Sequence, residues 1–290
     1  MSRPLRIRAL LLTAFALSAT AVSLFGQSQA RPAPRYLQDK RDEAEGARAL
    51  EQFRQAGLAG DYWLEFELRV LPRKGEERTL RGQLFGTMRP QGPLSRLVLP
   101  GDGGIATEQR WLFGAAGTGG AWQWRAGEAG GRVVGLEQSL APLTGTEVTL
   151  FDLQMPFLSW PERVYEGLAK VRGRPAHTFL LYAPAEVRAA QPDLAAVRVS
   201  LDGQFLALVQ ADFLTADGKS VKTISVLEVK KLGEQWIVKS VDVRNARTRD
   251  KTRFQVVAAA LEQVWPRPAF EPERLGDENP AVPAGAVQRF

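Results

Sequence analysis

The sequence has no cysteine and only one histidine among its 290 residues. The lack of cysteine excludes disulfides, thiolate metal sites, a cysteine nucleophile and the acylated N-terminal cysteine of bacterial lipoproteins. A single imidazole cannot build a histidine cluster around a metal ion, so we expect neither a metal nor another cofactor. Stability must come from an apolar core, and a chain of this length can bury one as a single domain.

Basic charge is sparse once the N-terminus is set aside. The formal net charge is +6, and Arg3, Arg6 and Arg8 supply +3 of it in a segment without acidic residues, which leaves +3 for the rest. The chain also has no long run of Lys or Arg. Nucleic-acid binding usually shows as a concentrated basic patch, so we expect no nucleic-acid partner.

The N-terminus has the pattern of a secretory signal peptide. The three arginines precede an uncharged apolar run over residues 9–25, and Ser28-Gln29-Ala30 places small residues where signal peptidase requires them. We therefore predict cleavage after Ala30 and export to the periplasm. The alternative is a retained membrane anchor, since an apolar run of about 17 residues is at the lower limit for crossing a bilayer.

Motifs for catalysis are scarce. His177 has no Gly-x-Ser-x-Gly nucleophile motif near it, and its pattern is typical of a structural histidine. The glycine-rich residues 101–104 and 114–120 lack the Gly-Lys-Ser/Thr ending of a phosphate-binding loop. We expect a protein that is not an enzyme, and scattered carboxylates leave a hydrolase as a remote alternative.

Hydrophobic periodicity predicts a mainly β protein. Residues 39–59 have helical spacing, whereas residues 62–70 and 80–88 alternate with a period of two and should form an antiparallel hairpin. Further strands are predicted at residues 96–99, 109–113, 121–125, 163–171, 177–182, 197–201, 205–214, 221–230, 236–243 and 252–257. Tight turns at 202–203, 216–219 and 232–234 fix antiparallel neighbours.

Two segments depart from this strand pattern. Residues 149–160 are dense in large apolar side chains and contain Pro156, which favours a short helix and loop. Residues 266–290 are rich in proline and charge, so we expect a mobile tail. The predicted architecture is a strongly curved antiparallel sheet that forms an incomplete barrel, covered by the N-terminal helix and the short central helix.

A family resemblance rests on residues 197–252. They read Val-Arg-Val-Ser-Leu-Asp, Phe-Leu-Ala-Leu-Val-Gln-Ala-Asp-Phe-Leu, Asp-Gly-Lys-Ser-Val-Lys-Thr and Gln-Trp-Ile-Val-Lys-Ser-Val-Asp-Val-Arg-Asn, and they close on Thr248 and Lys251-Thr252. This pattern resembles the outer-membrane lipoprotein-sorting proteins, the relatives of the periplasmic lipoprotein carrier LolA. It covers residues 31–265 loosely and about 55 residues well, and the middle of this chain is richer in Gly and Trp than the family pattern.

The resemblance implies a half-barrel whose helices act as a lid over an apolar cavity. It implies a monomeric carrier that binds lipoprotein acyl chains or lipid without catalysis and exchanges them with membrane-bound donor and acceptor proteins. The residues that we predict to line the cavity are Leu64, Phe66, Leu68, Leu84, Trp111, Phe113, Phe151 and Phe157. The same scaffold also suits a periplasmic protein-interaction or sensor module whose core is too well filled to admit a ligand.

Overall fold

The computed structural model describes residues 35–37, 41–101, 107–115 and 120–290. The predicted signal peptide, its cleavage site and the alternative of a retained anchor all lie outside these residues. Within the described ranges, no helix is long and apolar enough to cross a membrane.

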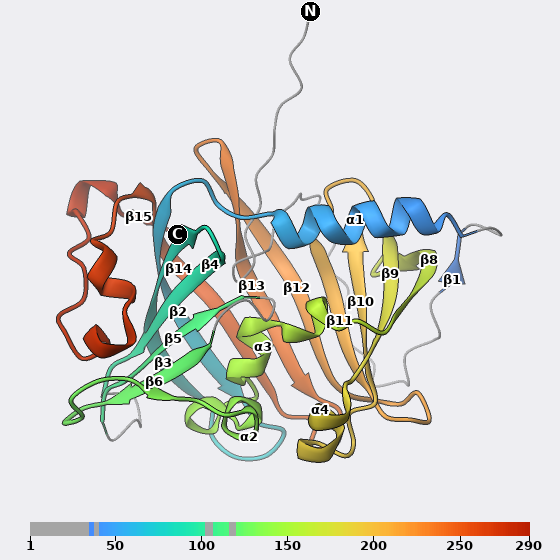
Figure 1. Cartoon of the computed structure of the whole chain (residues 1–290), viewed down its shortest axis with the longest axis horizontal. Helices are drawn as coiled ribbons and strands as arrows, with labels where there is room; N and C mark the ends of the chain where they lie inside the picture. Colours follow the sequence, from blue (N-terminus) through green and yellow to red (C-terminus); the bar gives the residue numbers. More distant parts are fainter. Residues whose placement is uncertain (1–34, 38–40, 102–106, 116–119) are drawn as a thin grey trace, which may run out of the picture.

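The described residues form one sheet in which fourteen strands follow a single path (Figure 1). In spatial order these strands are β1 Arg35–Tyr36, β8 Arg163–Val171, β9 Arg174–Tyr182, β10 Ala196–Asp202, β11 Leu208–Leu214, β12 Ser220–Leu232, β13 Gln235–Asn245, β14 Lys251–Gln263, β2 Asp61–Leu71, β3 Arg78–Arg89, β4 Gly92–Leu99, β5 Gln109–Gly114, β6 Ala121–Arg125 and β7 Arg132–Val133. A fifteenth strand, β15 Gln288–Arg289, pairs with β14.

The sheet is antiparallel and strongly curved, and its path ends at β1 on one side and at β7 on the other. These end strands are not paired with each other, so the barrel is incomplete, as the sequence predicted. The predicted hairpin forms between β2 and β3, and the three tight turns join β10, β11, β12 and β13 in succession. At the centre of the path, β2 pairs with β14 along its whole length, from Asp61 opposite Gln263 to Leu71 opposite Lys251.

Short helices cover the concave side of the sheet (Figure 1). The N-terminal helix is α1 Glu43–Gln55, within the predicted residues 39–59, and the Asp42 side chain caps it by accepting a hydrogen bond from the Glu45 amide at 3.0 Å. The predicted central segment contains α3 Leu150–Gln154 and the 3-10 helix η2 Pro156–Ser159. Further short helices are α2 Leu136–Leu140, η1 Leu143–Gly145 and α4 Ala185–Ala190.

The strand predicted at residues 205–214 begins later, at Leu208. The side chain of Asp202 accepts hydrogen bonds from the amides of Gln204 and Phe205, at 2.9 and 3.0 Å. Leu206 has a φ of 52°, in the left-handed region. This local network closes a turn over the residues that apolar patterning assigned to the strand.

The last 25 residues, predicted as a mobile tail, contain short helical turns and a short strand. They form η3 Arg267–Phe270, η4 Pro272–Arg274, η5 Ala284–Ala286 and β15, and they pack on the outside of the sheet (Figure 1, red). We call residues 266–290 the strap. Its apolar side chains bury an outer cluster that contains Trp63, Phe85, Val98, Leu112, Trp124, Trp265, Ala269, Phe270 and Leu275.

A buried arginine fastens the strap to the sheet. Arg96 of β4 is fully buried, and its guanidinium donates to the carbonyls of Ala269 at 2.9 Å, Leu275 at 3.1 Å and Asp277 at 2.8 Å. Arg110 of β5 donates to the carbonyl of Leu275 at 3.0 Å. The strap lacks periodicity because these carbonyls and isolated apolar contacts, rather than a repeating face, hold it in place.

Candidate functional site

The strands place one set of side chains in the interior and the other on the outer face. In β2, Tyr62, Leu64, Phe66 and Leu68 belong to the interior cluster, whereas Trp63 belongs to the outer cluster under the strap. This division follows from the period of two along a strand. The concave face is therefore apolar over a wide area.

All eight residues that the sequence predicted for the cavity lie in this interior cluster, and each is at most 4 % exposed. They come from five elements that are spread along the chain, namely β2, β3, β5, α3 and η2, and the curved sheet gathers them together. Contact of these side chains with a ligand stays a prediction. They are Leu64, Phe66, Leu68, Leu84, Trp111, Phe113, Phe151 and Phe157.

The first part of the lid is α1, which presents Ala49, Leu50 and Phe53 to the interior. Its Gly46 packs directly on the ring of Tyr165 in β8. At the other end of the helix, the Nε of Arg54 donates to the carbonyl of Leu158 at 2.7 Å. That bond joins α1 to η2, so the two parts of the lid are linked.

The second part of the lid, α3 with η2, carries a cluster of aromatic rings. Phe157 is fully buried, 6.2 Å from both Phe151 and Trp160 and 5.7 Å from Phe213 of β11 between ring centroids. Thr149 caps α3 by accepting a hydrogen bond from the amide of Asp152 at 3.1 Å. Met155 ends α3 with a φ of 47°, which turns the chain directly into η2.

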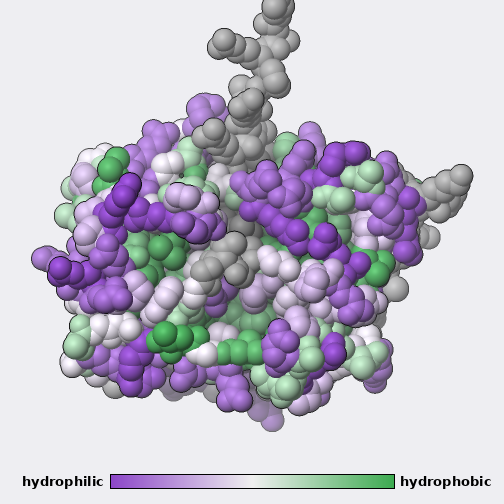
Figure 2. Space-filling view, in the orientation of Figure 1, coloured by the Kyte–Doolittle hydropathy of each residue, from purple (hydrophilic) through white to green (hydrophobic). Residues whose placement is uncertain are grey.

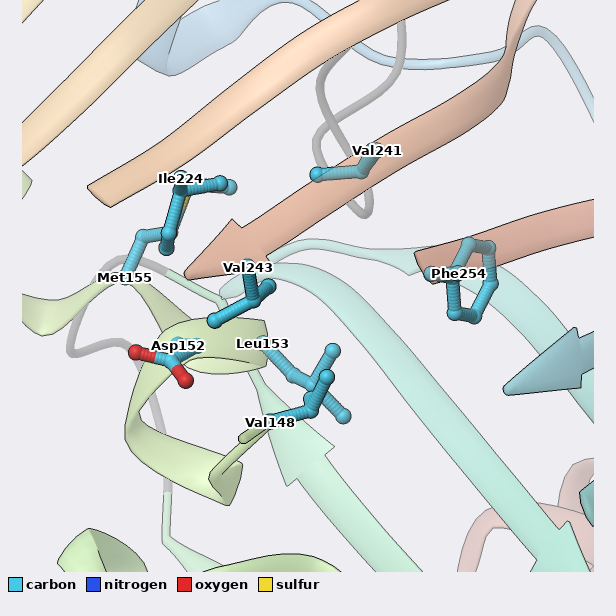
Figure 3. Close-up of a pocket in the computed structure, with 8 residues that line it drawn as sticks. All are labelled: Val148, Asp152, Leu153, Met155, Ile224, Val241, Val243 and Phe254. Atoms are coloured by element: carbon cyan, nitrogen blue, oxygen red, sulfur yellow. The ribbon is translucent and has the colours of Figure 1, made fainter. Parts of the chain in front are cut away.

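A pocket lies between this lid segment and the sheet (Figure 3). Its enclosed space is small, about 20 Å³, and the pocket opens towards solvent. Phe254 stacks on Phe66 with ring centroids 4.6 Å apart, so the pocket lies against the residues predicted for the cavity. The pocket itself is lined by Val148, Asp152, Leu153, Met155, Ile224, Val241, Val243 and Phe254.

Sequence reasoning did not select these lining residues. Leu153 and Met155 fall within the segment predicted as a short helix and loop of the lid, and Val241 and Val243 alternate with polar residues in a predicted strand. That alternation was the one sequence feature that could have identified Val241 and Val243 as inward-facing residues. Their meeting with Phe254 depends on the register of β13 with β14, where Val241 lies opposite Phe254.

The single histidine has a structural environment. His177 is 4 % exposed, and its Nδ1 shares a hydrogen bond of 2.8 Å with the hydroxyl of Tyr165. Its Nε2 lies 3.8 Å from a carboxylate oxygen of Glu45 in α1. Burial lowers the pKa of His177, and burial raises the pKa of Tyr165 to about 12. These contacts hold α1 against β8 and β9.

Other candidate chemistry is limited in the part of the chain that the structure describes. There, no group of three or more His, Asp or Glu side chains is arranged to hold a metal ion. Of the two glycine-rich segments, residues 102–106 and 116–119 lie outside the described ranges.

The face that carries the lid combines polar and apolar surface (Figure 2). Hydrophilic residues gather over α1, and hydrophobic patches show in the depression below it. Some apolar surface thus borders the opening between the lid elements and the sheet.

Solved structures with the same fold cover most of this chain. A DUF1329 family protein from Desulfovibrio piger gives a TM-score of 0.64 at 16% identity, over 80% of this chain and 98% of that one. A domain assigned as outer membrane lipoprotein-sorting, from Vibrio parahaemolyticus, gives 0.67 at 15% identity, over 80% and 97%. A LolA superfamily protein from Nitrosomonas europaea gives 0.57 at 13% identity, over 79% and 96%.

No protein-family model and no curated protein matches the sequence. The resemblance to the lipoprotein-sorting proteins is confirmed at the level of the fold. Identities this low show the fold alone, because one scaffold supports several functions.

Proposed function

We propose, from the fold that this chain shares with lipoprotein-sorting and LolA superfamily structures, that it is a periplasmic carrier of acyl chains. It binds the chains of lipoproteins or lipids in its apolar interior and moves them towards the outer membrane without catalysis. One observation carries the proposal. The wide concave face of the sheet is apolar and is covered by short, separate helices rather than by a second sheet.

Binding on this proposal is an exchange of apolar surfaces. An acyl chain replaces lid side chains such as Phe151 and Phe157 against the sheet, and each methylene removed from water contributes about 0.8 kcal/mol. The lid side chains compete for the same space, which keeps the affinity moderate and the binding reversible. A carrier needs both properties, since it must release what it binds.

The proposed periplasmic location rests on the N-terminal sequence pattern. The proposed signal peptide, residues 1–30, is removed after Ala30, and the absence of cysteine leaves the mature chain without a lipid anchor of the lipoprotein type. A monomer that diffuses freely then exchanges cargo with membrane-bound donor and acceptor proteins.

A second candidate function is a protein-interaction or sensor module on the same scaffold. The tight packing of the lid against the sheet favours it, because Phe157 and Leu158 are fully buried among the interior side chains. A module of this kind uses its outer surface and needs no ligand in the interior.

Native mass spectrometry of the protein, expressed from its full-length sequence with export to the periplasm, tests the proposal. Bound acyl ligands support the carrier, and a delipidated protein that takes up no fluorescent fatty-acid analogue overturns it. A stable protein partner in a pull-down without lipid then supports the interaction module.

A matched pair of variants separates interior binding from surface binding. Val241→Phe fills the pocket and should reduce uptake of the fluorescent analogue several-fold. Val264→Phe adds the same bulk at a position that is 90 % exposed and should leave uptake unchanged. Equal uptake by both variants argues against binding in the interior.

A further inference from the structure

One carboxylate stands in the wall of the otherwise apolar pocket. Asp152 of α3 is 5 % exposed and lines the pocket together with aliphatic, methionine and phenylalanine side chains (Figure 3). Charged side chains are rarely buried this deeply unless they are paired. A carboxylate at this position therefore needs hydrogen-bond or ion-pair partners for both of its oxygens.

The two oxygens of Asp152 have different surroundings. Oδ2 accepts a hydrogen bond from the amide of Thr149 at 2.8 Å and pairs with the ammonium of Lys222 from β12. Oδ1 is buried and has no hydrogen-bond partner among the described residues. A buried acceptor left unsatisfied is costly, and this one belongs to a residue of the pocket wall.

We infer that Asp152 Oδ1 accepts a hydrogen bond from the head of an acyl ligand, and that this head is a neutral group with a donor, an amide N–H or a hydroxyl. The inference rests on the proposed carrier function and names the class of ligand for the same site. The apolar walls of the pocket receive the first methylenes beside that head.

Electrostatics separates this head from charged ones. Asp152 and Lys222 together form a neutral pair, so a neutral head adds no uncompensated charge to a buried site. A carboxylate or phosphate head brings a negative charge towards Oδ1, and burying such a charge without a partner is strongly unfavourable. A cationic head is not needed either, because Lys222 already balances the charge of Asp152.

Three ligands with the same chain length test the inference on the wild-type protein. Each displaces a fluorescent fatty-acid analogue from the delipidated full chain: N-methylhexadecanamide, which has one N–H; N,N-dimethylhexadecanamide, which has none; and hexadecanoate. We expect the first to bind about ten-fold more tightly than the second, as the loss of one hydrogen bond to a charged group implies, with hexadecanoate the weakest. Equal affinities for the two amides overturn the head-group inference and leave the carrier function intact, whereas no displacement by any ligand counts against both.

A pair of variants assigns the preference to one residue. Asp152→Asn keeps the size of the side chain and removes the negative charge, so the ten-fold preference for the N–H amide should fall to about two-fold or less. Asp242→Asn is the control, because Asp242 pairs with Arg253 at 2.7 Å and lies on the opposite face of β13 from Val241 and Val243. A preference that survives in Asp152→Asn overturns the assignment, and if this variant does not fold, the comparison of the two amides on the wild type decides.

Discussion

Gly46 of α1 lies so close to Tyr165 of β8 that a Cβ at position 46 would come within 2.5 Å of the ring carbon Cγ. The hydroxyl of this tyrosine shares a hydrogen bond with His177, and Glu45 of the helix lies beside the same imidazole. The position of α1 on the sheet is therefore set by three contacts around Tyr165: the close approach of Gly46, the hydrogen bond to His177 and the proximity of Glu45 to that imidazole.

Gly46→Ala should loosen α1. The added methyl group overlaps the Tyr165 ring, and overpacking of this kind costs about 1–3 kcal/mol of unfolding free energy. Urea unfolding measures the loss, and faster uptake of a fluorescent fatty-acid analogue would report easier opening of the lid. Gly285→Ala is the control, since a Cβ at position 285 meets no atom within 4 Å. Equal unfolding free energies of Gly46→Ala and Gly285→Ala would contradict the close contact between Gly46 and Tyr165.

The buried imidazole makes stability depend on pH. Burial lowers the pKa of His177, opposed in part by the charges of Glu45 and Asp202, so the unfolded chain takes up a proton first as the pH falls below about 6.5. The stabilising contribution is complete above that pH and is lost as the pH falls through the lower pKa of the folded protein. His177→Asn should flatten this part of the curve of unfolding free energy against pH, and an unchanged slope between about pH 7 and pH 5 would refute the assignment.

Arg96→Met should release the strap. The guanidinium of Arg96 is buried, which lowers its pKa to about 10, so it remains charged at neutral pH while it donates to carbonyls of the strap, among them those of Ala269, Leu275 and Asp277. Loss of these bonds should lower the unfolding free energy by more than about 3 kcal/mol and should speed tryptic cleavage after Arg274. Arg81→Met is the control, because the Arg81 side chain is 71% exposed and its ion pair contributes within about 1 kcal/mol.

Phe157→Ala should show how much the aromatic cluster of the lid contributes. The side chain is fully buried among Phe151, Trp160 and Phe213, and removing a core phenylalanine usually costs about 3–5 kcal/mol. Thermal or urea unfolding measures the change. Val264→Ala, at a position that is 90% exposed, should differ from the wild type by less than about 0.5 kcal/mol. A loss at position 157 as small as this would mean that the site collapses around the missing ring.

Strand periodicity was sufficient to predict most of the sheet, because alternation over residues such as Leu64, Phe66 and Leu68 depends only on local geometry. Tight turns then fixed which strands are neighbours. The inward direction could not be derived from alternation alone, since Trp63 and Phe85 make the outer face apolar as well. Apolar residues on both faces required a cover on each, and the cover of the outer face is the strap.

The pocket depends on long-range register, which local pattern does not contain. Val241 meets Phe254 through the pairing of β13 with β14, and Asp152 meets Lys222 across 70 residues of sequence. Neither partner is marked by its neighbours in the chain. The sequence therefore allowed prediction of an apolar interior, but not of the buried pair of Asp152 and Lys222 beside the pocket.

The pairing of β2 with β14 ties residues 61–71 to residues 251–263. In a chain that is threaded across a membrane from its N-terminus, the central ladder of the sheet cannot begin to form until its last long strand has emerged. Folding dominated by such distant contacts is slow, and the unpaired edge of β2 stays exposed during the wait. With the export proposed above, the order of the strands thus leaves the chain open to aggregation until its synthesis and translocation are nearly complete.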